Sequence, residues 1–401
     1  GTSNTTGEEA VPPASASSDF SGSAQSGSPV PSSHEELYDL ENDSLFVTFS
    51  SLGGSIKHLE AKAFLRFHEA SATLIDIEKG LRGSHSLVFP FEKAGFDRAD
   101  FKRDKSLETG ENTIAFSAVK DGTVKISKIY HLLPLKSALE LEIVFENISQ
   151  QPQELQYEVA AQLHFADSET VSQEQATLES GARIENKVES KDLGTISKKG
   201  FLKEGAIAWT FVSKKYFALV TDPLTISFER SRSIRLNSNE IANFALLPAL
   251  SLAPGTKHSQ NFLIYAGAKE YNVLKSYKRN YQEIFSKGFF GTFRVWLLIA
   301  LQFFYSWLHN WGWAIVAITC VIKLAFTPLT HMSFESMKKM QAVQPKVKAI
   351  QEKYKKDPQA MNKHVMELYK KHKVNPMGGC LPLVLQMPIF IAFYQTLYQA
   401  I

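Results

Sequence analysis

One charged residue lies inside an apolar run that is long enough to cross a membrane. Residues Trp311 to Leu329 read WGWAIVAITCVIKLAFTPL, and Lys323 has no acidic residue within the run to pair with. As a helix these 19 residues measure roughly 28 Å, about the thickness of a bilayer core. A charge near mid-bilayer costs roughly 2.5–3.5 kcal/mol on insertion scales, so an intramembrane lysine indicates a functional site.

Three threonines share the helical face of this lysine. Thr319, Thr327 and Thr330 stand four residues before it, four after it and seven after it, which places them in one stripe. Two readings stay open. Lys323 can snorkel to the nearer interface, about 12 Å along the helix, or it can face a polar cavity. The threonine stripe favours the polar cavity.

The net charge of +3 conceals a strongly basic segment between two apolar ones. Residues 331–380 hold 11 lysines against four acidic residues. The positive-inside rule therefore predicts that this segment is cytoplasmic and that everything before Trp311 lies outside. Contact with ribosomal RNA is a second role for such a segment, beside orientation.

The ends and the cysteines add two expectations. The chain shows no initial Met and no signal sequence, yet an outside domain needs a hydrophobic segment ahead of it, so we expect a fragment whose first membrane segment is absent. It also stops abruptly within an apolar run, as a truncated chain would, and the family resemblance given below implies that the last membrane helices are absent too. Cys320 and Cys380 lie in or beside membrane segments, which predicts no disulfide in the N-terminal domain.

The first two thirds of the chain predict a tether and a β domain. Residues 1–35 are rich in Ser, Gly, Pro and Thr and cannot bury a core. Residues 36–268 show short or alternating apolar runs separated by turns, among them Gly53-Gly54, Asp121-Gly122 and Pro254-Gly255. We predict one antiparallel sandwich of more than a dozen strands.

Residues 269–310 predict a charged helical connector followed by an apolar helix. The helix over 289–308 is long enough to span, but only His309 and Asn310 separate it from the next run. Two spans would also place the β domain on the side of the basic segment. We therefore prefer a helix lying in the outer interface, with Trp296, Tyr305 and Trp307 as anchors, followed by a transmembrane helix over 311–330.

The basic segment 331–380 predicts a helical hairpin. Apolar residues recur at spacings of three and four in both arms, and Lys356, Asp357 and Pro358 form the turn. Such arms can pair as an antiparallel coiled coil. An ordinary solvated loop is the alternative.

A second span is predicted over 381–401, kinked by Pro382 and Pro388. Its glutamines need partners in lipid. They either join helices or line a wet groove shared with the Lys323 helix, and both readings stay open. These glutamines are Gln386, Gln395 and Gln399.

Several motifs in the C-terminal part resemble those of one known family. They are Asn310-Trp311-Gly312, Thr327-Pro328-Leu329-Thr330, MKKM with QPK after it, LYK at 368–370, and the long run KVNPMGGCLPLVLQMPIF at 373–390. From about Asn310 to Tyr394 the chain resembles the YidC/Oxa/Alb family of membrane protein insertases. The β region resembles more weakly the large periplasmic domain of the Gram-negative members, through Gly53-Gly54, KKYF at 214–217 and NFLIYAGAKE.

The resemblance implies a multidomain fold: an all-β antiparallel supersandwich in the periplasm, then α-helical membrane segments with a cytoplasmic hairpin. It implies a multi-pass protein of the bacterial inner membrane, with residues 1–310 on the periplasmic side. In the family a basic residue, usually arginine, faces a hydrophilic groove, and Lys323 occupies that position. The departure matters, because arginine stays charged whereas a desolvated lysine can lose its proton.

The function implied is insertion and folding of nascent membrane proteins, not covalent chemistry, and no cofactor is expected. Partners implied are nascent membrane proteins, the lipid bilayer, the Sec translocon, the ribosome and targeting factors, but not DNA. The substrate groove is predicted from Lys323, Thr319, Thr327, Thr330 and Gln386. Contacts of the cytoplasmic hairpin are predicted from Lys338, Lys339, Lys346, Lys355 and Lys356.

Two other classes of function stay open from the residues alone. A membrane-anchored carbohydrate-binding or mutarotase-like protein would need a cleft with carboxylates and histidines, for which His131, His164 and Glu142 are loose candidates. An ion-conducting pore would use Lys323 as an anion-selecting charge. The sequence has neither a GxxxxGK[ST] motif nor an HExxH metal motif.

Overall fold

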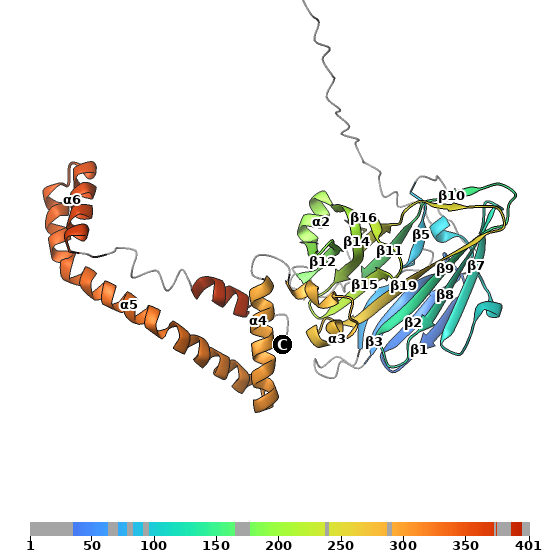
Figure 1. The fold of residues 1–401 in the computed structure, drawn as a ribbon, viewed down its shortest axis with the longest axis horizontal. Helices are drawn as coiled ribbons and strands as arrows, with labels where there is room; N and C mark the ends of the chain where they lie inside the picture. Colours follow the sequence, from blue (N-terminus) through green and yellow to red (C-terminus); the bar gives the residue numbers. More distant parts are fainter. Residues whose placement is uncertain are drawn as a thin grey trace, which may run out of the picture.

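The structure is a computed structural model that describes residues 35–62, 71–77, 83–90, 96–164, 177–236, 240–286, 291–372, 374 and 386–394. A β domain comes first, and helices extend away from one side of it (Figure 1). The predicted fold class, an antiparallel β-sandwich followed by helical segments, is confirmed. The tether predicted over 1–35 lies outside the described residues except for Glu35.

Two small sheets flank the main one, and every strand pairing among the described residues is antiparallel. The four-stranded sheet comprises, in spatial order, β1 (Leu37–Glu41), β2 (Leu45–Ser50), β3 (Ser55–Lys62) and β4 (Ser71–Asp76). The two-stranded sheet pairs β10 (Gln153–Leu155) with β18 (Leu250–Leu252).

Among the described residues the main sheet has 13 strands. Across the sheet they are β5 (Ser86–Val88), β11 (Glu158–His164), β17 (Glu240–Leu246), β16 (Phe228–Arg235), β14 (Phe201–Ser213), β15 (Phe217–Pro223), β19 (Lys257–Ala268), β9 (Ala138–Asn147), β8 (Val124–Leu132), β7 (Thr113–Lys120) and β6 (Lys102–Arg103). The long strand β14 also pairs with β12 (Glu179–Ile184), which pairs with β13 (Lys187–Asp192). Short helices between strands are η2 (Phe96–Arg98), η3 (Lys105–Leu107) and α2 (Leu193–Lys199).

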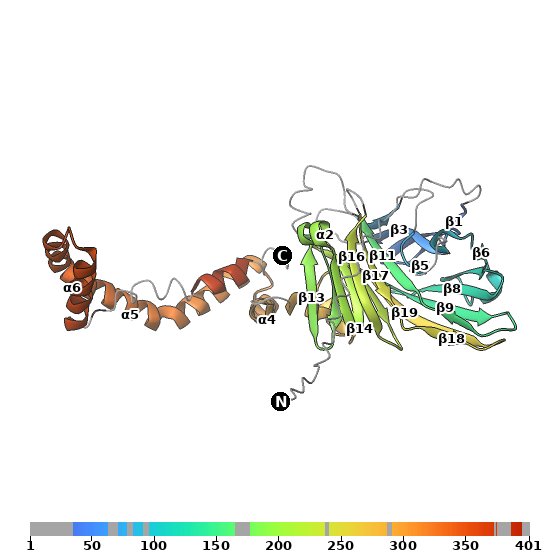
Figure 2. The ribbon, with the colours of Figure 1, turned by 90° about the horizontal axis from the view of Figure 1, so that it is seen from above.

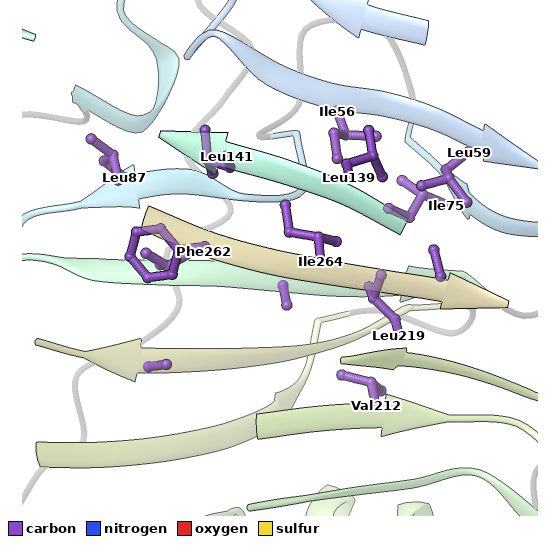
Figure 3. Close-up of a cluster of buried hydrophobic side chains, with 14 of the residues drawn as sticks. Ile56, Leu59, Ile75, Leu87, Leu139, Leu141, Val212, Leu219, Phe262 and Ile264 are labelled. Atoms are coloured by element: carbon purple, nitrogen blue, oxygen red, sulfur yellow. The ribbon is translucent and has the colours of Figure 1, made fainter. Parts of the chain in front are cut away.

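The hydrophobic core lies between the four-stranded sheet and the main sheet, which form two layers (Figure 2). Figure 3 shows Ile56 and Leu59 of β3 facing toward strands β9 and β19 of the main sheet. Leu141 of β9 and Ile264 of β19 are fully buried there. Burying a side chain of this size contributes about 1.5–3 kcal/mol, so this cluster supplies most of the stability of the β domain.

The glycine turns follow the predicted positions. Asp121 and Gly122 have φ of 50° and 68° and join β7 to β8, so the predicted hairpin is confirmed. Gly53, at φ 69° between β2 and β3, is constrained further, because a Cβ placed on it would stand 2.4 Å from the backbone oxygen of Asp97. The chain at Gly53 therefore tolerates no side chain.

The connector predicted over 269–288 is two short helices rather than one. They are α3 (Tyr271–Ser276) and the 3-10 helix η4 (Tyr281–Ser286), and Lys278 and Asn280 between them have positive φ. Leu274, Tyr281 and Ile284 are buried in a second cluster on the outer side of the main sheet. The break lets the segment follow the sheet instead of projecting from it.

One carboxylate fixes this segment to the sheet. Asp222 of β15 is fully buried and accepts two hydrogen bonds from the Arg279 guanidinium, at 2.6 and 2.7 Å, and one from the Tyr281 hydroxyl, at 2.7 Å. The indole N–H of Trp209 donates to the backbone oxygen of Arg279 at 3.0 Å. The end of the β domain is therefore held in one position where the chain leaves it.

Within the described stretch 291–372 three helices follow, of which one is very long: α4 (Gly291–Leu308), α5 (Trp311–Lys353) and α6 (Pro358–Lys371). The transmembrane helix predicted over 311–330 and the first hairpin arm are one continuous helix of 43 residues. Pro358 begins α6 instead of stopping the first arm, and Asp357 caps α6 by accepting from the N–H groups of Gln359 and Ala360.

The end of α5 and α6 pack together through a small apolar cluster around Val343 and Val347. This confirms a helical hairpin, while its pairing as a coiled coil stays a prediction. Of the second predicted span, residues 386–394 are helical. Pro382, Gln395 and Gln399 lie outside the described residues.

Candidate functional site

Among the described residues, α5 is the one helix long and apolar enough to cross a bilayer by length and composition. Its most apolar window is only 11% buried within the structure. A core helix of a soluble protein would be covered by its neighbours, so this exposure favours a helix that is surrounded by lipid.

Lys323 lies on a face of α5 that the described residues leave uncovered. The face that packs against α4 contains the buried Ala314 and Ile318. At 3.6 residues per turn, Lys323 stands about 140° around the axis from Ile318 and about 180° from Ala314. Lys323 is exposed, and within the described part of the chain it forms no ion pair.

The three threonines share this face, but their hydroxyls donate to their own helix. Thr319, Thr327 and Thr330 donate to the backbone oxygens four residues earlier, at 2.7, 2.9 and 2.8 Å. The backbone oxygen that accepts from the Thr327 hydroxyl is that of Lys323 itself. Each hydroxyl oxygen keeps its lone pairs as acceptors, so the stripe can still bind water or a polar group.

Gln386 is not brought to Lys323 by the described residues. It begins the described part of the last helix, and Ala392 and Phe393 of that helix join the cluster formed with α4. Figure 1 draws the helical segment 386–394 near α4 and apart from the middle of α5. A groove shared by Gln386 and Lys323 stays a prediction.

Helix α4 has apolar residues on two sides. Leu297 and Leu301 are buried toward α5, whereas Trp296 and Trp307 are 72% and 76% exposed. Tyr305, which was predicted as an anchor, instead stacks on Trp311 with ring centroids 4.0 Å apart. The exposed side is typical of a helix that lies against lipid.

The turn between α4 and α5 is as short as the sequence predicts. His309 has a φ of 49°, and the Asn310 side chain caps α5 by accepting from the N–H of Trp313 at 3.2 Å. The two helices are therefore fixed to one another by a capped turn and a shared apolar cluster.

The hairpin lysines are solvent-exposed. Lys339 forms an ion pair with Glu335 at 2.9 Å, one turn earlier on α5. Lys346 lies 3.4 Å from the ring nitrogen Nε2 of His372, which joins the two arms. The exposed predicted contact residues are Lys338, Lys339, Lys346, Lys355 and Lys356.

The three candidates for a carbohydrate site are not gathered in one place. His131 of β8 pairs with Thr113, and Glu142 of β9 accepts from the Ser259 hydroxyl. His164 lies on β11, six positions away from β9 in the order of the main sheet. No group of three or more His, Cys, Asp or Glu that could hold a metal ion occurs among the described residues.

Sequence reasoning missed one polar group deep in the β domain. Lys128 is fully buried and donates to the backbone oxygens of Gly53, at 3.1 Å, and His85, at 2.7 Å. Burial lowers the pKa of Lys128 to about 7. Burial and the nearby Lys128 lower the pKa of His85 to about 3. The alternation of β8 was the available signal, because Ile126 and Tyr130, two residues to either side, point into the core.

Two family models divide the chain between them. The model described as the YidC periplasmic domain matches residues 37–300. The one described as 60Kd inner membrane protein matches residues 303–401. The chain belongs to the YidC family of membrane protein insertases. The resemblance stated from the motifs is thereby confirmed over both halves of the chain.

Curated relatives carry the YidC name. The membrane protein insertase YidC of Geobacter sulfurreducens is 32% identical over 366 residues, which are 88% of this chain and 67% of that protein. That of Geobacter sp. strain M21 is 41% identical over 219 residues, covering 54% of this chain and 40% of that protein. The matches thus span 40% and 67% of the relatives' own length.

Among solved structures, a putative aldose 1-epimerase from Escherichia coli K12 is similar to the chain with a TM-score of 0.45 and 9% identity. The match covers 59% of this chain and 100% of that one. Likeness at this level says nothing about activity.

Proposed function

We propose that this chain forms part of an insertase that helps nascent proteins enter and fold in the inner membrane without covalent chemistry. The observation that carries the proposal is the position of Lys323. It stands with three threonines on a face of an exposed apolar helix that the described residues do not cover. Keeping a cation there is costly unless it serves a polar cavity.

The barrier in membrane insertion is the desolvation of a polar segment that must cross lipid. A groove open to the cytoplasm and to lipid shortens the distance that this polar segment must cross through hydrocarbon without water. In it Lys323 attracts acidic residues of the substrate transiently, and the threonine oxygens hold water. The arriving apolar helix then partitions into lipid, which supplies the free energy without ATP.

The basic hairpin is the receiving surface in this proposal. Its exposed lysines face the cytoplasm if α5 crosses the bilayer with its N-terminus outside. We assign it the nascent chain, the ribosome and targeting factors as partners, with the Sec translocon beside the groove. A cationic, exposed helix pair suits anionic RNA and acidic protein surfaces.

The β domain and α4 belong on the periplasmic side in this arrangement. A domain that precedes a single crossing lies opposite the basic hairpin. Helix α4 lies in the outer interface, because its exposed tryptophans suit that zone and its short turn into α5 leaves little room for a second crossing.

Site-specific crosslinking in the full-length protein tests the groove. A photoreactive residue replaces Thr327, beside Lys323, and ribosome-stalled membrane protein chains are added. The matched control places the same residue at Val321, which is also exposed on α5 but lies about 120° around the axis from Thr327. We expect adducts with the nascent chain from position 327, and lipid adducts alone from position 321.

The charge is tested on the same protein. Lys323→Glu should abolish the adduct at position 327, whereas Lys323→Arg, which keeps the charge, should preserve it. Adducts only with lipid at both positions would mean that the lysine snorkels, and the groove would be abandoned for this helix.

A further inference from the structure

The most exposed large apolar side chain among the described residues lies in the β domain and not on a membrane helix. Leu135 is 79% exposed, above Trp307 and Trp296 of α4. It occupies the turn between β8 and β9 with a φ of 56°. A leucine in this backbone region is disfavoured, and full exposure of its side chain to water is a second cost.

The turn is held rigidly, so its tip cannot fold back onto the domain. The side-chain amide of Asn42 donates to the backbone oxygens of Leu133, at 2.7 Å, and of Lys136, at 3.2 Å. The backbone oxygen of Ser137 accepts from the N–H of Ala266 at 2.9 Å. These contacts present Leu135 outward on a fixed support.

This turn stands at the end of the β domain from which the chain passes to the membrane helices. Leu133 packs on the same apolar cluster as α3, η4 and Val295 of α4. Figure 1 shows α3 on the side of the β domain that faces α4. Only two residues separate α4 from the bilayer-spanning candidate α5. The end that carries Leu135 is therefore tied to the helix that leads into the bilayer.

Charges of both signs surround the turn, because the exposed Glu41 and Asp43 flank Asn42, which holds the turn, and Glu140 is exposed on β9. Lys136 is the next residue and is exposed, and Lys275 and Lys278 are exposed on the connector that packs beside the turn. Glu270 is the exposed acidic residue at the start of α3. An apolar tip with charged neighbours matches the surface of a bilayer, where acyl chains lie below the headgroups.

We propose that the β8–β9 turn, residues 133–137, is a lipid contact that inserts Leu135 into the outer surface of the bilayer. The proposal rests on the placement of α4 in the interface stated above, and not on insertion activity. With α4 flat, its N-terminal end and the attached turn lie at the surface. With α4 upright, its 18 residues would lift the turn about 27 Å away.

Depth-dependent quenching in the full chain tests this contact. Cys320 and Cys380 are replaced by Ser, and a single cysteine carrying an environment-sensitive fluorophore is placed by Leu135→Cys. The chain is reconstituted in vesicles of phosphatidylcholine with one part in three phosphatidylglycerol, with or without a doxyl group high on the acyl chain. We expect a blue-shifted emission that doxyl lipid quenches.

Two matched positions make the result decisive. Val119→Cys lies on β7 beside Lys125, near the opposite end of β8 and about 30 Å from the turn, and the Val119 side chain is also exposed. Trp296→Cys reports α4. We expect quenching at 135 to approach that at 296 and to exceed that at 119 several-fold.

Each other outcome overturns a distinct statement. Quenching at 296 with position 135 behaving as 119 does would refute the lipid contact and leave the placement of α4 intact. If neither position 296 nor position 135 is quenched, the placement of α4 in the outer interface is refuted, and the lipid contact is refuted with it. A fluorophore at Lys136→Cys gives the same test while Leu135 is retained. In that labelled variant, the additional substitution Leu135→Asp should return the emission to that seen at position 119.

Discussion

The buried lysine of the β domain predicts an unusual dependence of stability on pH. Lys128 is fully buried, and its hydrogen-bond acceptors are two neutral backbone oxygens. Lys128→Met replaces the ammonium with an unbranched apolar side chain of similar length. The change removes both the hydrogen bonds and the titrating group, but only the titrating group gives a pH-dependent term.

The sign follows from proton binding in the two states. Burial lowers the pKa of Lys128 from 10.5 to about 7 in the folded protein, while the unfolded chain keeps the ordinary value. Between these pH values the unfolded state binds one proton more than the folded state, so the free energy of unfolding rises with pH. The cost of the charge is fully present below pH 7 and disappears as the pH approaches 10.5.

The magnitude follows from the same shift. Each pH unit contributes about 1.4 kcal/mol per proton, and Lys128 is half-protonated near its folded pKa. Relative to Lys128→Met, the wild-type chain should therefore gain about 2 kcal/mol between pH 7 and pH 9. The range stops below pH 10 because burial raises the pKa of Tyr277 to about 12 and that of Tyr281 further, and these phenols would destabilise the folded state above that pH.

Pulse proteolysis across a urea series measures the folded fraction of the β domain in the detergent-solubilised full chain. The matched control is Lys125→Met, on the same strand but at a half-exposed position paired with Asp104. That variant should follow the wild-type profile. Parallel profiles for wild type and Lys128→Met would refute the reasoning, because they would mean that Lys128 is hydrated or stays charged in the folded state.

The contacts in the structure predict the effects of three further substitutions. Gly53→Ala should destabilise the β domain by about 2–3 kcal/mol, since it combines a strained φ with a backbone clash, whereas Gly110→Ala in open space should change little by the same urea assay. Tyr281→Phe should cost about 1–3 kcal/mol by removing a donor from the buried Asp222, and protease cleavage between the β domain and α4 should quicken. Asp357→Ala removes the cap of α6, which costs about 1 kcal/mol and should speed amide exchange in α6 about fivefold, with no change in α4.

Most of the architecture could be predicted from local patterns. Alternating strands around Asp121-Gly122 led to the right hairpin, and the apolar run from Trp311 led to the right helix start. Such features depend on a few neighbouring residues, so one sequence is enough to see them. The exposure of the hairpin lysines could be predicted in the same way, because their spacing places them on a different helical face from the apolar residues.

Features set by partners distant in sequence could not be predicted. The connector looks like one amphipathic helix, yet Arg279 and Tyr281 turn toward a carboxylate on β15, and the helix breaks to satisfy it. Tyr305 looks like an interfacial anchor, yet it stacks on the first residue of the next helix. In both cases the deciding contact is with a residue outside the segment whose apolar spacing was used for the prediction.

The continuity of α5 joins the two parts of the candidate site mechanically. Lys323 and the first hairpin arm stand on one helix of 43 residues, about 64 Å long, of which a bilayer core takes about 30 Å. A flexible loop between them would absorb any motion of the hairpin, whereas a helix transmits a tilt along its length. The internal prolines, Pro328 and Pro345, each remove one backbone hydrogen bond and define where the helix can bend. If the hairpin binds a macromolecule as proposed, its motion would reach the level of Lys323 along this helix, with bending confined to these two points.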